Sequence, residues 1–380
     1  MKKAIILFFY IPAGLLIFYF NFFLPPHQEQ FISLASSFLQ GKLYFLSPVF
    51  DASFFENQYF WPLGPFPAIL LMPFVFLSGG SITQGYLLFF LNIFNLFLLY
   101  RISKKVSGNS TTSIVISFAV IFSTAYLGIA LIPWSWYFAQ SVGFGLTLLA
   151  LEAYFFNRTW LMIGVYVGLA FATRVSLIFT VVFFILSLLF SDLPKPKKIK
   201  NFVLLFLPIV ITCILIGTYN WARFGNILEG GYSKQLLEGA VAENRAVGLW
   251  SFAHFPANLY SMFLKMPESI SVPPFLKVDG SGLSLLITSS IFIWIIFSDW
   301  KNSKVKFAAI TCLFIIFFLA GSFTNGSWQY GSRYAIDYYP FLFIMLLYSF
   351  KKEVSSKFIV LTAVSFLLNL FFLNQVYNLF

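Results

Sequence analysis

Three carboxylates fall within one polar and aromatic stretch near the start of the chain, residues 25–67. They are Glu29, Asp51 and Glu56, and His27 lies two residues before the first of them. A carboxylate beside a membrane surface can take the proton of a hydroxyl group and so create a nucleophile. Glu29 and Asp51 are therefore the candidate bases, whereas Glu56 is typical of a solvated turn.

Basic residues in later polar segments are candidates for holding an anion. An arginine guanidinium can bind a phosphate through two parallel hydrogen bonds. A base that deprotonates a hydroxyl and a cation that holds a phosphate could together catalyse attack of the hydroxyl on a phosphate-linked lipid substrate whose tail lies in the bilayer. The candidates are Arg174, Arg223, Arg245, Lys265 and Arg333, and Tyr334 follows the last of them.

The same residues have purely structural interpretations, which the sequence leaves open. Glu29 can stabilise a helix N-terminus, and Asp51 can cap a turn. Arg333 can pair with Asp337, four residues further along a helix. Arg174 can extend its side chain to the lipid–water boundary.

The composition is that of a protein embedded in a membrane. Of the 380 residues, 59% are hydrophobic and 10% are charged, whereas soluble domains have roughly 25% charged residues. The net charge of +11 then serves to orient the chain in the bilayer, and no nucleic-acid partner is expected. Cys213 and Cys312 lie within apolar runs, and His27 and His254 are isolated. Neither a disulfide nor a metal or other cofactor is predicted from them.

Apolar runs recur along the whole chain. Since a spanning helix needs about 20 apolar residues, we expect an all-α polytopic membrane protein with about eleven transmembrane helices, forming one integral membrane domain over residues 1–380. Two large loops are expected outside the membrane, at 25–83 and 220–282. The spans are placed near residues 4–24, 84–102, 111–131, 137–156, 160–173, 175–190, 201–219, 283–298, 307–323, 339–350 and 358–377.

The apolar run at residues 65–77 is excluded from the spans. Its 13 residues include three prolines and would reach about 20 Å as a helix, against a hydrocarbon core of roughly 30 Å. A re-entrant or interfacial segment is therefore predicted. With this choice most Lys and Arg residues fall in short inner segments such as 101–105, 195–200 and 351–357, as the positive-inside rule requires. The N-terminus is then cytoplasmic, and most acidic residues lie outside.

The first outer loop contains an amphipathic pattern. Apolar residues at positions 31, 34, 35, 38 and 39 recur at the spacing of one helix face. The pattern predicts a helix lying flat on the outer membrane surface, with His27 and Glu29 in its first turn. Gly41 is expected to end it.

Arg174 is the one charged residue between positions 160 and 190. This apolar stretch is too long for a single span, so we expect a tight hairpin that turns near Thr173–Arg174. The turn places the arginine at the outer face and avoids the cost of burying its charge, at least about 2.5 kcal/mol.

Several blocks resemble the C-type glycosyltransferases, multi-spanning enzymes that use polyprenyl-phosphate sugars and include the aminoarabinose transferases and the protein O-mannosyltransferases. HQEQFISLASSFLQGKLYF (27–45) and DASFFENQYFWPLGPFPAILLMPF (51–74) are similar to the first outer loop of that family. YNWARFGNILEGGY (219–232) and YGSRYAIDYYPFL (330–342) are similar to later blocks of its bacterial relatives. These four blocks cover about a fifth of the chain.

The resemblance implies roles for particular residues. In the family an acidic residue early in the first loop is the catalytic base. Glu29 stands nearest that place, and Asp51 is its rival. The Arg333–Tyr334 pair corresponds to a position close to the donor phosphate, and His27 is a further substrate-binding candidate. The segment PWSWYFAQS at 133–141 lacks the acidic residue that several relatives carry there, which argues against a metal-dependent mechanism.

From these observations we expect a multi-pass glycosyltransferase of the bacterial inner membrane. It would move a sugar from a polyprenyl-phosphate donor to a hydroxyl of a lipid, glycan or protein at the outer face, with inversion at the anomeric carbon. Arg333, with Arg174 or Arg223, would stabilise the leaving phosphate. One alternative is a transporter or flippase for a lipid-linked glycan, which would need ionisable or helix-breaking residues at mid-membrane. The other is a non-catalytic assembly protein, in which the outer acids are dispensable.

Overall fold

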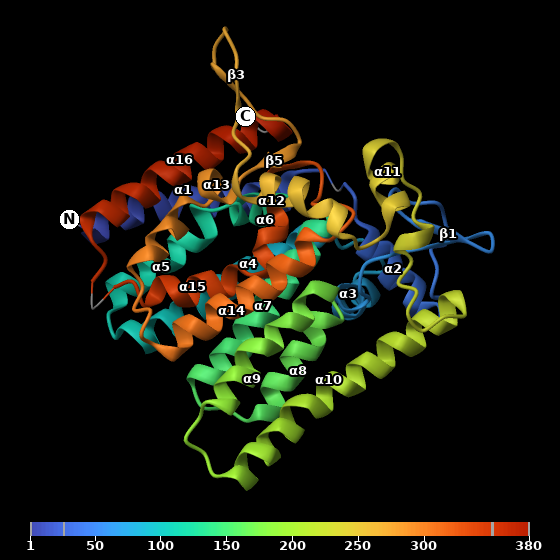
Figure 1. The fold of residues 1–380 in the computed structure, drawn as a ribbon. Coiled ribbons are helices and arrows are strands. Elements are labelled where there is room, and N and C mark those ends of the chain that lie inside the picture. The colour runs from blue at the N-terminus through green and yellow to red at the C-terminus, as the bar shows by residue number, and fades with distance from the viewer. Residues whose placement is uncertain (1, 26, 351–352, 379–380) are drawn as a thin grey trace. The chain divides into compact units, whose positions relative to one another are not determined.

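Helices make up most of the chain, and the strands of the described part form three short pairs (Figure 1). The computed structural model describes residues 2–25, 27–350 and 353–378. The chain divides into two compact units. The first comprises Met1–Tyr19, Ile93–Leu131 and Trp250–Phe380, and the second comprises Phe20–Asn92 and Ile132–Leu249.

The second unit contains residues 25–83 except the undescribed residue 26, which are the predicted first outer loop, and the helices that support them. Helices α1 (Lys2–Phe23) and α4 (Gln84–Ser107) contribute residues to both units. Strands β1 and β2 form an antiparallel pair in which Ser53 faces Phe60. The remaining elements of this unit are α2 (Gln30–Leu39), β1 (Ser53–Phe55), β2 (Gln58–Phe60), α3 (Phe66–Leu77), α7 (Ser135–Phe155), α8 (Trp160–Phe171), η1 (Val175–Thr180), α9 (Val181–Leu189), α10 (Lys195–Phe224), η2 (Tyr232–Lys234) and α11 (Gly239–Val247).

The first unit contains the C-terminal part of the chain. Strands β3 and β4 are antiparallel, and β5 and β6 are parallel. Its elements are α5 (Ser110–Phe122), α6 (Tyr126–Leu131), η3 (Phe252–His254), α12 (Phe255–Phe263), β3 (Glu268–Ser269), β4 (Leu276–Lys277), β5 (Ser281–Leu283), α13 (Leu285–Thr288), η4 (Ser290–Phe297), α14 (Ser303–Ala320), β6 (Gln329–Gly331), η5 (Arg333–Asp337), α15 (Tyr339–Leu347) and α16 (Ser356–Tyr377).

Within the described residues, five helices are long and apolar enough to cross a membrane: α4, α7, α10, α14 and α16. The predicted number of eleven spans is not confirmed, because several predicted spans are divided into shorter helical pieces. The orientation of the chain stays a prediction, and Lys351 and Lys352 of the predicted inner segment 351–357 lie outside the described residues.

The break between α5 and α6 shows how one predicted span, 111–131, is divided. Hydroxyl groups bind the backbone on both sides of the break: Ser289 Oγ accepts from the Ala125 N–H at 3.1 Å, and the Tyr330 hydroxyl donates to the Thr124 carbonyl at 3.0 Å. Ser123 Oγ donates to the Thr362 carbonyl at 2.8 Å. Irregular backbone is tolerated in such an apolar setting when other parts of the protein satisfy its polar groups.

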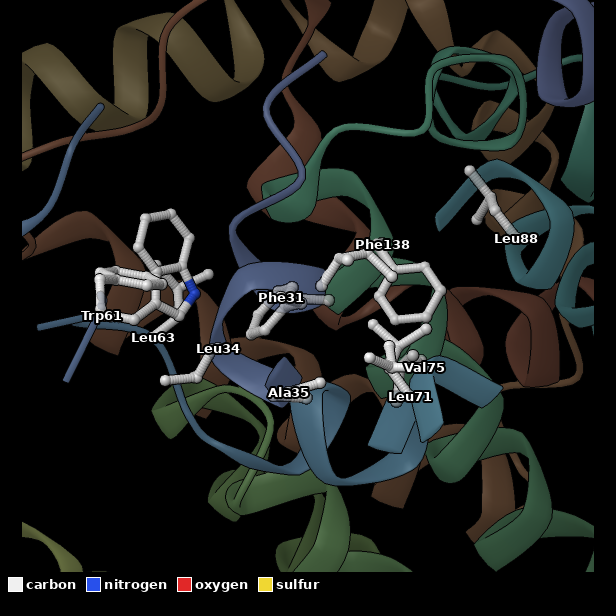
Figure 2. Close-up of a cluster of buried hydrophobic side chains, with 14 of the residues drawn as sticks. Phe31, Leu34, Ala35, Trp61, Leu63, Leu71, Val75, Leu88 and Phe138 are labelled. Carbon is white, nitrogen blue, oxygen red and sulfur yellow. The ribbon is translucent and has the colours of Figure 1, made fainter. Parts of the chain in front are cut away.

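Helix α2 has the predicted apolar face, but that face packs against protein. Phe31, Leu34 and Ala35 are fully buried in a core that includes Trp61 from the first loop and Phe138 from α7 (Figure 2). The prediction that this face lies on lipid is therefore corrected, because α3 and α7 cover it. The place of α2 at the membrane surface stays a prediction.

The ends of α2 differ in how well the sequence predicted them. The helix begins at Gln30, so His27 and Glu29 precede it rather than forming its first turn. It ends at Leu39, just before the predicted stop at Gly41, which has φ +70°. The Gly41 N–H donates to the Phe38 carbonyl and the Lys42 N–H to the Ser37 carbonyl, both at 3.0 Å. This is the Schellman arrangement that a left-handed glycine permits.

The short helix α3, Phe66–Leu77, has 12 residues, which extend about 18 Å. This length is too short to span a bilayer, and α3 packs on α2. The re-entrant or interfacial placement of residues 65–77 stays a prediction.

The predicted turn near Arg174 is present between α8 and η1. It packs closely on the first loop, since a Cβ at Gly64 would lie 2.1 Å from the Ala172 carbonyl oxygen. The Phe66 N–H donates to the same oxygen at 3.3 Å. Gly64 therefore allows the first loop and the Arg174 turn to be in direct backbone contact.

Candidate functional site

Glu29 lies at the N-terminus of α4, a helix that begins 55 positions later in the chain. Its Oε1 accepts a hydrogen bond of 2.7 Å from the backbone N–H of Gln84, the first residue of α4. The first N–H groups of a helix have no partner within the helix and carry a partial positive charge. The carboxylate therefore stabilises the start of α4, and α4 holds the carboxylate in place.

Ser135, the first residue of α7, fixes the neighbouring backbone. The Gln28 carbonyl accepts from the Ser135 N–H at 2.9 Å and from Ser135 Oγ at 2.8 Å. The Phe31 N–H donates to Ser135 Oγ at 3.2 Å. The Gln84 side chain donates to the Pro133 carbonyl at 3.2 Å. The N-termini of α2, α4 and α7 therefore meet around residues 28–31.

The environment of Glu29 favours its protonated form. Burial raises the pKa of the Glu29 carboxyl from 4.5 to about 7, and the hydrogen bond from the Gln84 N–H opposes this shift. Among the described residues, Oε2 accepts no hydrogen bond, so one oxygen is held and the other is open to a proton donor. A base with a pKa near the working pH is the most effective in proton transfer.

Glu29→Gln is expected to stabilise the protein at high pH. The pKa of the folded state is raised, so the unfolded chain loses this proton above pH 4.5 while the folded chain keeps it to about pH 7. Stability is therefore lost as pH rises through this window. Above pH 7 the variant should be more stable by about 1–2 kcal/mol, a value reduced for partial solvent exposure. Thermal unfolding at pH 4.5 and pH 8 measures the difference.

Glu56→Gln, which replaces an exposed carboxylate of the same loop, is the matched control. The difference in its thermal stability between the two pH values should equal that of the wild type. A Glu29→Gln protein that is less stable than the wild type at pH 8 would contradict the burial argument.

Asp51 is held by two neutral side chains. Its Oδ2 accepts from Trp136 Nε1 at 2.9 Å, and its Oδ1 accepts from Gln235 Nε2 at 2.6 Å. The residue has φ +65°, a conformation that Asp tolerates in turns better than most residues. Both oxygens thus tie the first loop to α7 and to the segment after α10. These contacts support a structural role, and a role as base stays a prediction.

Residues 232–245 cover the Asp51 turn. Gln235 is buried, and the Leu236 N–H donates to the Ala52 carbonyl at 2.9 Å. Arg245 Nη1 donates to the Tyr232 carbonyl at 3.3 Å and to the Gln235 carbonyl. The Gln30 side chain donates to the Phe50 carbonyl at 3.3 Å and to Gln28 Oε1 at 2.6 Å. It therefore connects the Asp51 turn with the segment around Glu29.

Arg223, at the end of α10, is 6% exposed and is held by contacts within the protein. Its Nη1 donates to the Trp61 carbonyl and its Nη2 to Asn220 Oδ1, both at 2.8 Å. The guanidinium lies 3.9 Å from the centre of the Tyr219 ring. These contacts join α10 to the first loop. A phosphate-binding role for Arg223 stays a prediction.

Arg174 is half-buried beside α7. A Cβ at Gly143 would lie 2.5 Å from Leu177 Cδ1 and 3.8 Å from Arg174 Cδ, so the glycine allows this turn to approach the helix closely. Gly143 lies eight residues beyond Ser135 on α7, which corresponds to about 12 Å along the helix axis. Arg174 thus packs about two turns along α7 from the segment that holds Glu29.

Arg333 and Tyr334 belong to the other unit and begin η5. Arg333 is 7% exposed, and its guanidinium lies 5.1 Å from the centre of the Tyr334 ring. Its backbone N–H donates to Gln329 Oε1 at 3.1 Å. A Cβ at Gly326 would lie 2.9 Å from Arg333 Nε, so Gly326 leaves the space that this side chain fills.

The structure therefore places Glu29, Asp51, Arg174 and Arg223 in one unit, and the exposed His27 lies in the same unit. The neutral residues that orient the two acids were not predicted from the sequence. These are Gln84, Ser135, Trp136 and Gln235. Only the helix-starting position of Ser135, after Pro133, gave a local signal. The others become partners through contacts between distant segments.

Among the described residues, no group of three or more His, Cys, Asp or Glu side chains is arranged to hold a metal ion. Metal independence stays a prediction.

This chain has only distant similarity to known proteins. No family model and no curated protein matches the sequence. Two solved structures of the oligosaccharyltransferase AglB from the archaeon Archaeoglobus fulgidus are similar over 99% of this chain, each at 9% identity. The apo form has a TM-score of 0.49, and the complex with an inhibitory peptide and a dolichol-phosphate has a TM-score of 0.46. The chain spans about half the length of these structures, 56% and 55%. Similarity at this level assigns neither a fold family nor an activity to the chain.

Proposed function

We propose that this protein is a membrane glycosyltransferase that moves a sugar from a polyprenyl-phosphate donor to an acceptor hydroxyl. The observation that supports the proposal most is the Glu29 carboxylate, which is fixed at the start of α4 and has a pKa of about 7. The sequence blocks that resemble C-type glycosyltransferases support the same activity. The five helices of the described residues that are long enough to cross a bilayer agree with a substrate whose tail lies in lipid.

In the proposed reaction Glu29 acts as general base. Its free Oε2 takes the proton of the acceptor hydroxyl, and the acceptor oxygen forms a bond to the anomeric carbon of the sugar. The bond between that carbon and the phosphate oxygen breaks, and the polyprenyl phosphate leaves with the electron pair. A single displacement inverts the anomeric carbon. The Gln84 N–H keeps the carboxylate oriented throughout.

Arg333 is proposed to stabilise the leaving phosphate, with Arg174 as a second candidate. Each charge-assisted hydrogen bond contributes about 1.5–3 kcal/mol. Arg333→Gln should therefore lower kcat/KM for the lipid donor by roughly 10- to 150-fold. Arg333→Lys keeps the charge but loses the paired geometry, and should fall between the wild type and Arg333→Gln. Steady-state kinetics with varied donor concentration measures the effect. Full activity of Arg333→Gln would assign the phosphate to another cation.

The proposed setting is the outer face of a bacterial inner membrane, with the N-terminus in the cytoplasm. The basic segments 101–105 and 195–200 support this orientation through the positive-inside rule. The acceptor is a hydroxyl of a lipid, a glycan or a protein.

A transporter for a lipid-linked glycan is the second candidate. The break between α5 and α6 supports it, because interrupted helices line substrate sites in many transporters. The backbone of this break is satisfied by protein hydroxyls, and the break is fully buried. The enzyme therefore remains the better proposal.

One assay separates the two candidates. Purified protein in proteoliposomes receives a polyprenyl-phosphate sugar that is labelled in both the sugar and the lipid. An enzyme releases unglycosylated polyprenyl phosphate and transfers the sugar label to the acceptor. A transporter moves the intact double-labelled lipid between leaflets. Transport without cleavage, across a panel of hydroxyl acceptors, would reject the glycosyltransferase.

A further inference from the structure

Strands β3 and β4 form a hairpin, residues 268–277, that projects from the helices of its unit near the C-terminal end of α16 (Figure 1). Glu268 faces Lys277, and Ser269 faces Leu276. Backbone hydrogen bonds close its turn: the Ile270 N–H donates to the Phe275 carbonyl at 3.0 Å, and the Phe275 N–H donates to the Val272 carbonyl at 2.8 Å.

The tip of the hairpin is apolar and exposed. Val272 and Phe275 are 61% and 59% exposed, and Pro273 and Pro274 between them are also exposed. No charged residue occurs between Glu268 and Lys277. Val272 and Phe275 are not among the residue types that usually build turns, which are Gly, Pro, Asn, Asp and Ser. A cluster of exposed apolar side chains marks a contact with a partner or a membrane.

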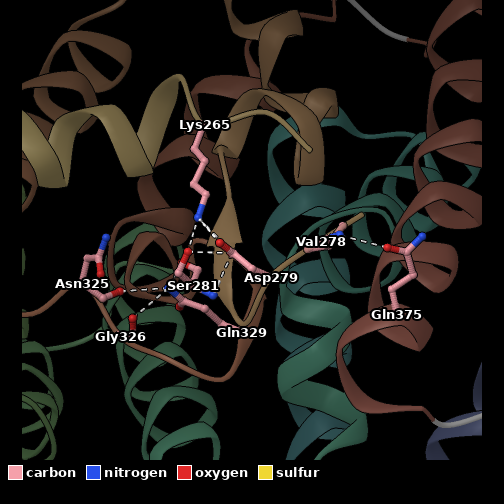
Figure 3. A network of polar contacts seen from close by, with 8 residues as sticks. All are labelled: Lys265, Val278, Asp279, Ser281, Asn325, Gly326, Gln329 and Gln375. Carbon is pink, nitrogen blue, oxygen red and sulfur yellow. Dashed lines mark hydrogen bonds and ion pairs between the residues drawn. The ribbon is translucent and has the colours of Figure 1, made fainter. Parts of the chain in front are cut away.

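The base of the hairpin is held firmly, which fixes the direction of the tip. Lys265 Nζ lies 2.9 Å from Asp279 Oδ1, and Ser281 binds the same pair (Figure 3). Gln329 Nε2 donates to the Ser281 carbonyl at 3.0 Å. The tip thus extends from an ordered network at the base of the hairpin.

A second set of contacts attaches the hairpin to α16. Gln375 Oε1 accepts from the Val278 N–H at 3.0 Å, and Gln375 Nε2 donates to the Leu276 carbonyl at 2.8 Å. Gln375 lies in the last turn of α16, one of the helices long and apolar enough to cross a membrane. The end of such a helix marks the lipid–water boundary. The base of the hairpin therefore lies at that level.

Aromatic residues support this placement. Tyr377, at the end of α16, donates through its hydroxyl to the Trp328 carbonyl at 2.6 Å, and Trp328 is 62% exposed. Trp and Tyr gather at membrane–water interfaces. Each arm of the ten-residue hairpin 268–277 has five residues, which reach at most about 16 Å when extended, so the tip can enter the hydrocarbon edge from a base among the headgroups.

We propose that the tip of the hairpin, residues 271–276, inserts into the interfacial layer of the membrane beside the end of α16. Val272, Phe275 and the two prolines would contact phospholipid acyl chains, and Lys277 would lie among the headgroup phosphates. The lipid is preferred to a protein partner because the base is continuous with the end of a membrane-spanning helix. The hairpin would anchor this unit to the lipid surface whatever reaction the protein carries out.

Site-specific labelling of the full chain tests the proposal. Cys213 is exposed and is replaced by alanine, whereas Cys312 is buried and stays. Val272→Cys, or Phe275→Cys as a second site, then carries an environment-sensitive fluorophore. Glu243→Cys on α11, at an exposed polar position, is the matched control. The protein is placed in nanodiscs of phosphatidylethanolamine and phosphatidylglycerol, with and without nitroxide-labelled lipid.

We expect the label at residue 272 to emit at shorter wavelength and to lose roughly half of its intensity to the lipid nitroxide, as for segments inserted about 5–10 Å. The control should respond to aqueous iodide instead. A label at 272 or 275 that iodide quenches as strongly as the control would overturn the proposal. Protection from both quenchers would also overturn it and indicate a protein contact. Both sites are exposed, so the unfolding midpoint should match that of the Cys213→Ala parent.

Discussion

Glu29→Gln is expected to lower the rate of sugar transfer by about 10²- to 10⁴-fold, the usual contribution of a general base. Glutamine keeps a carbonyl oxygen that can accept the hydrogen bond from the Gln84 N–H, so the start of α4 should remain intact. The lower rate of sugar transfer would then result from the loss of proton transfer and not from a change in the fold. Transfer from a polyprenyl-phosphate sugar by purified protein in lipid measures it, with expression and donor binding recorded in parallel.

The pH dependence gives this experiment a second readout. A base must be deprotonated to act, so wild-type kcat/KM should rise with pH and level off above about 7, the pKa of Glu29. The residual activity of Glu29→Gln should lack this rise.

Asp51→Asn is the matched control, because it also converts a carboxylate of the first loop to an amide. Asparagine can still accept a hydrogen bond from Trp136 or Gln235 through one oxygen. We expect Asp51→Asn to reduce stability and to keep the pH profile. If Asp51→Asn abolished the rise and Glu29→Gln did not, the roles of the two acids would be reversed.

Phe31→Ala is expected to lower the free energy of unfolding by about 3–5 kcal/mol. Phe31 is fully buried, and its ring meets the Trp61 ring edge-on at 5.8 Å (Figure 2). It also lies 6.3 Å from the Phe138 ring. Removing the ring leaves a cavity among α2, α7 and the first loop, which are all held by other contacts and can close it only in part. Thermal unfolding in detergent measures the change.

Phe54→Ala is the matched control, because Phe54 belongs to the same loop and is 40% exposed. Removing the Phe54 ring should change the free energy of unfolding by about 0.5 kcal/mol or less. An equal effect of the two substitutions would show that the core around Phe31 does not carry the stability of this unit.

The sequence by itself determined the features that depend on local pattern. The membrane class follows from composition, since 59% hydrophobic residues leave too few polar groups for a soluble surface. The stop of α2 before Gly41 and the turn before Val175 were predicted correctly, and the re-entrant or interfacial placement of residues 65–77 stays a prediction. Each depends on a backbone preference or an apolar spacing that neighbouring residues settle.

Only the tertiary structure decided what covers the apolar face of α2 and how many helices have spanning length. An apolar face is equally satisfied by lipid or by protein, so the pattern at residues 31–39 could not show that Phe138 and Trp61 lie against it. In the same way, an apolar run does not reveal an internal break. The run at 111–131 is divided because hydroxyls from Ser289 and Tyr330, far along the chain, bind the backbone where the helix stops.

The candidate site depended on tertiary contacts most of all. Sequence analysis selected Glu29 and Asp51 as carboxylates in a polar loop, and it allowed that Glu29 could serve a helix terminus. It could not show that the helix is α4, or that Asp51 is held by Trp136 and by Gln235, 184 positions away. Such partners are joined by hydrogen bonds between segments that meet only after folding. The local sequence thus provides both acids. Packing decides that both oxygens of Asp51 accept hydrogen bonds, whereas Glu29 has a hydrogen-bonded Oε1 and keeps Oε2 for a substrate.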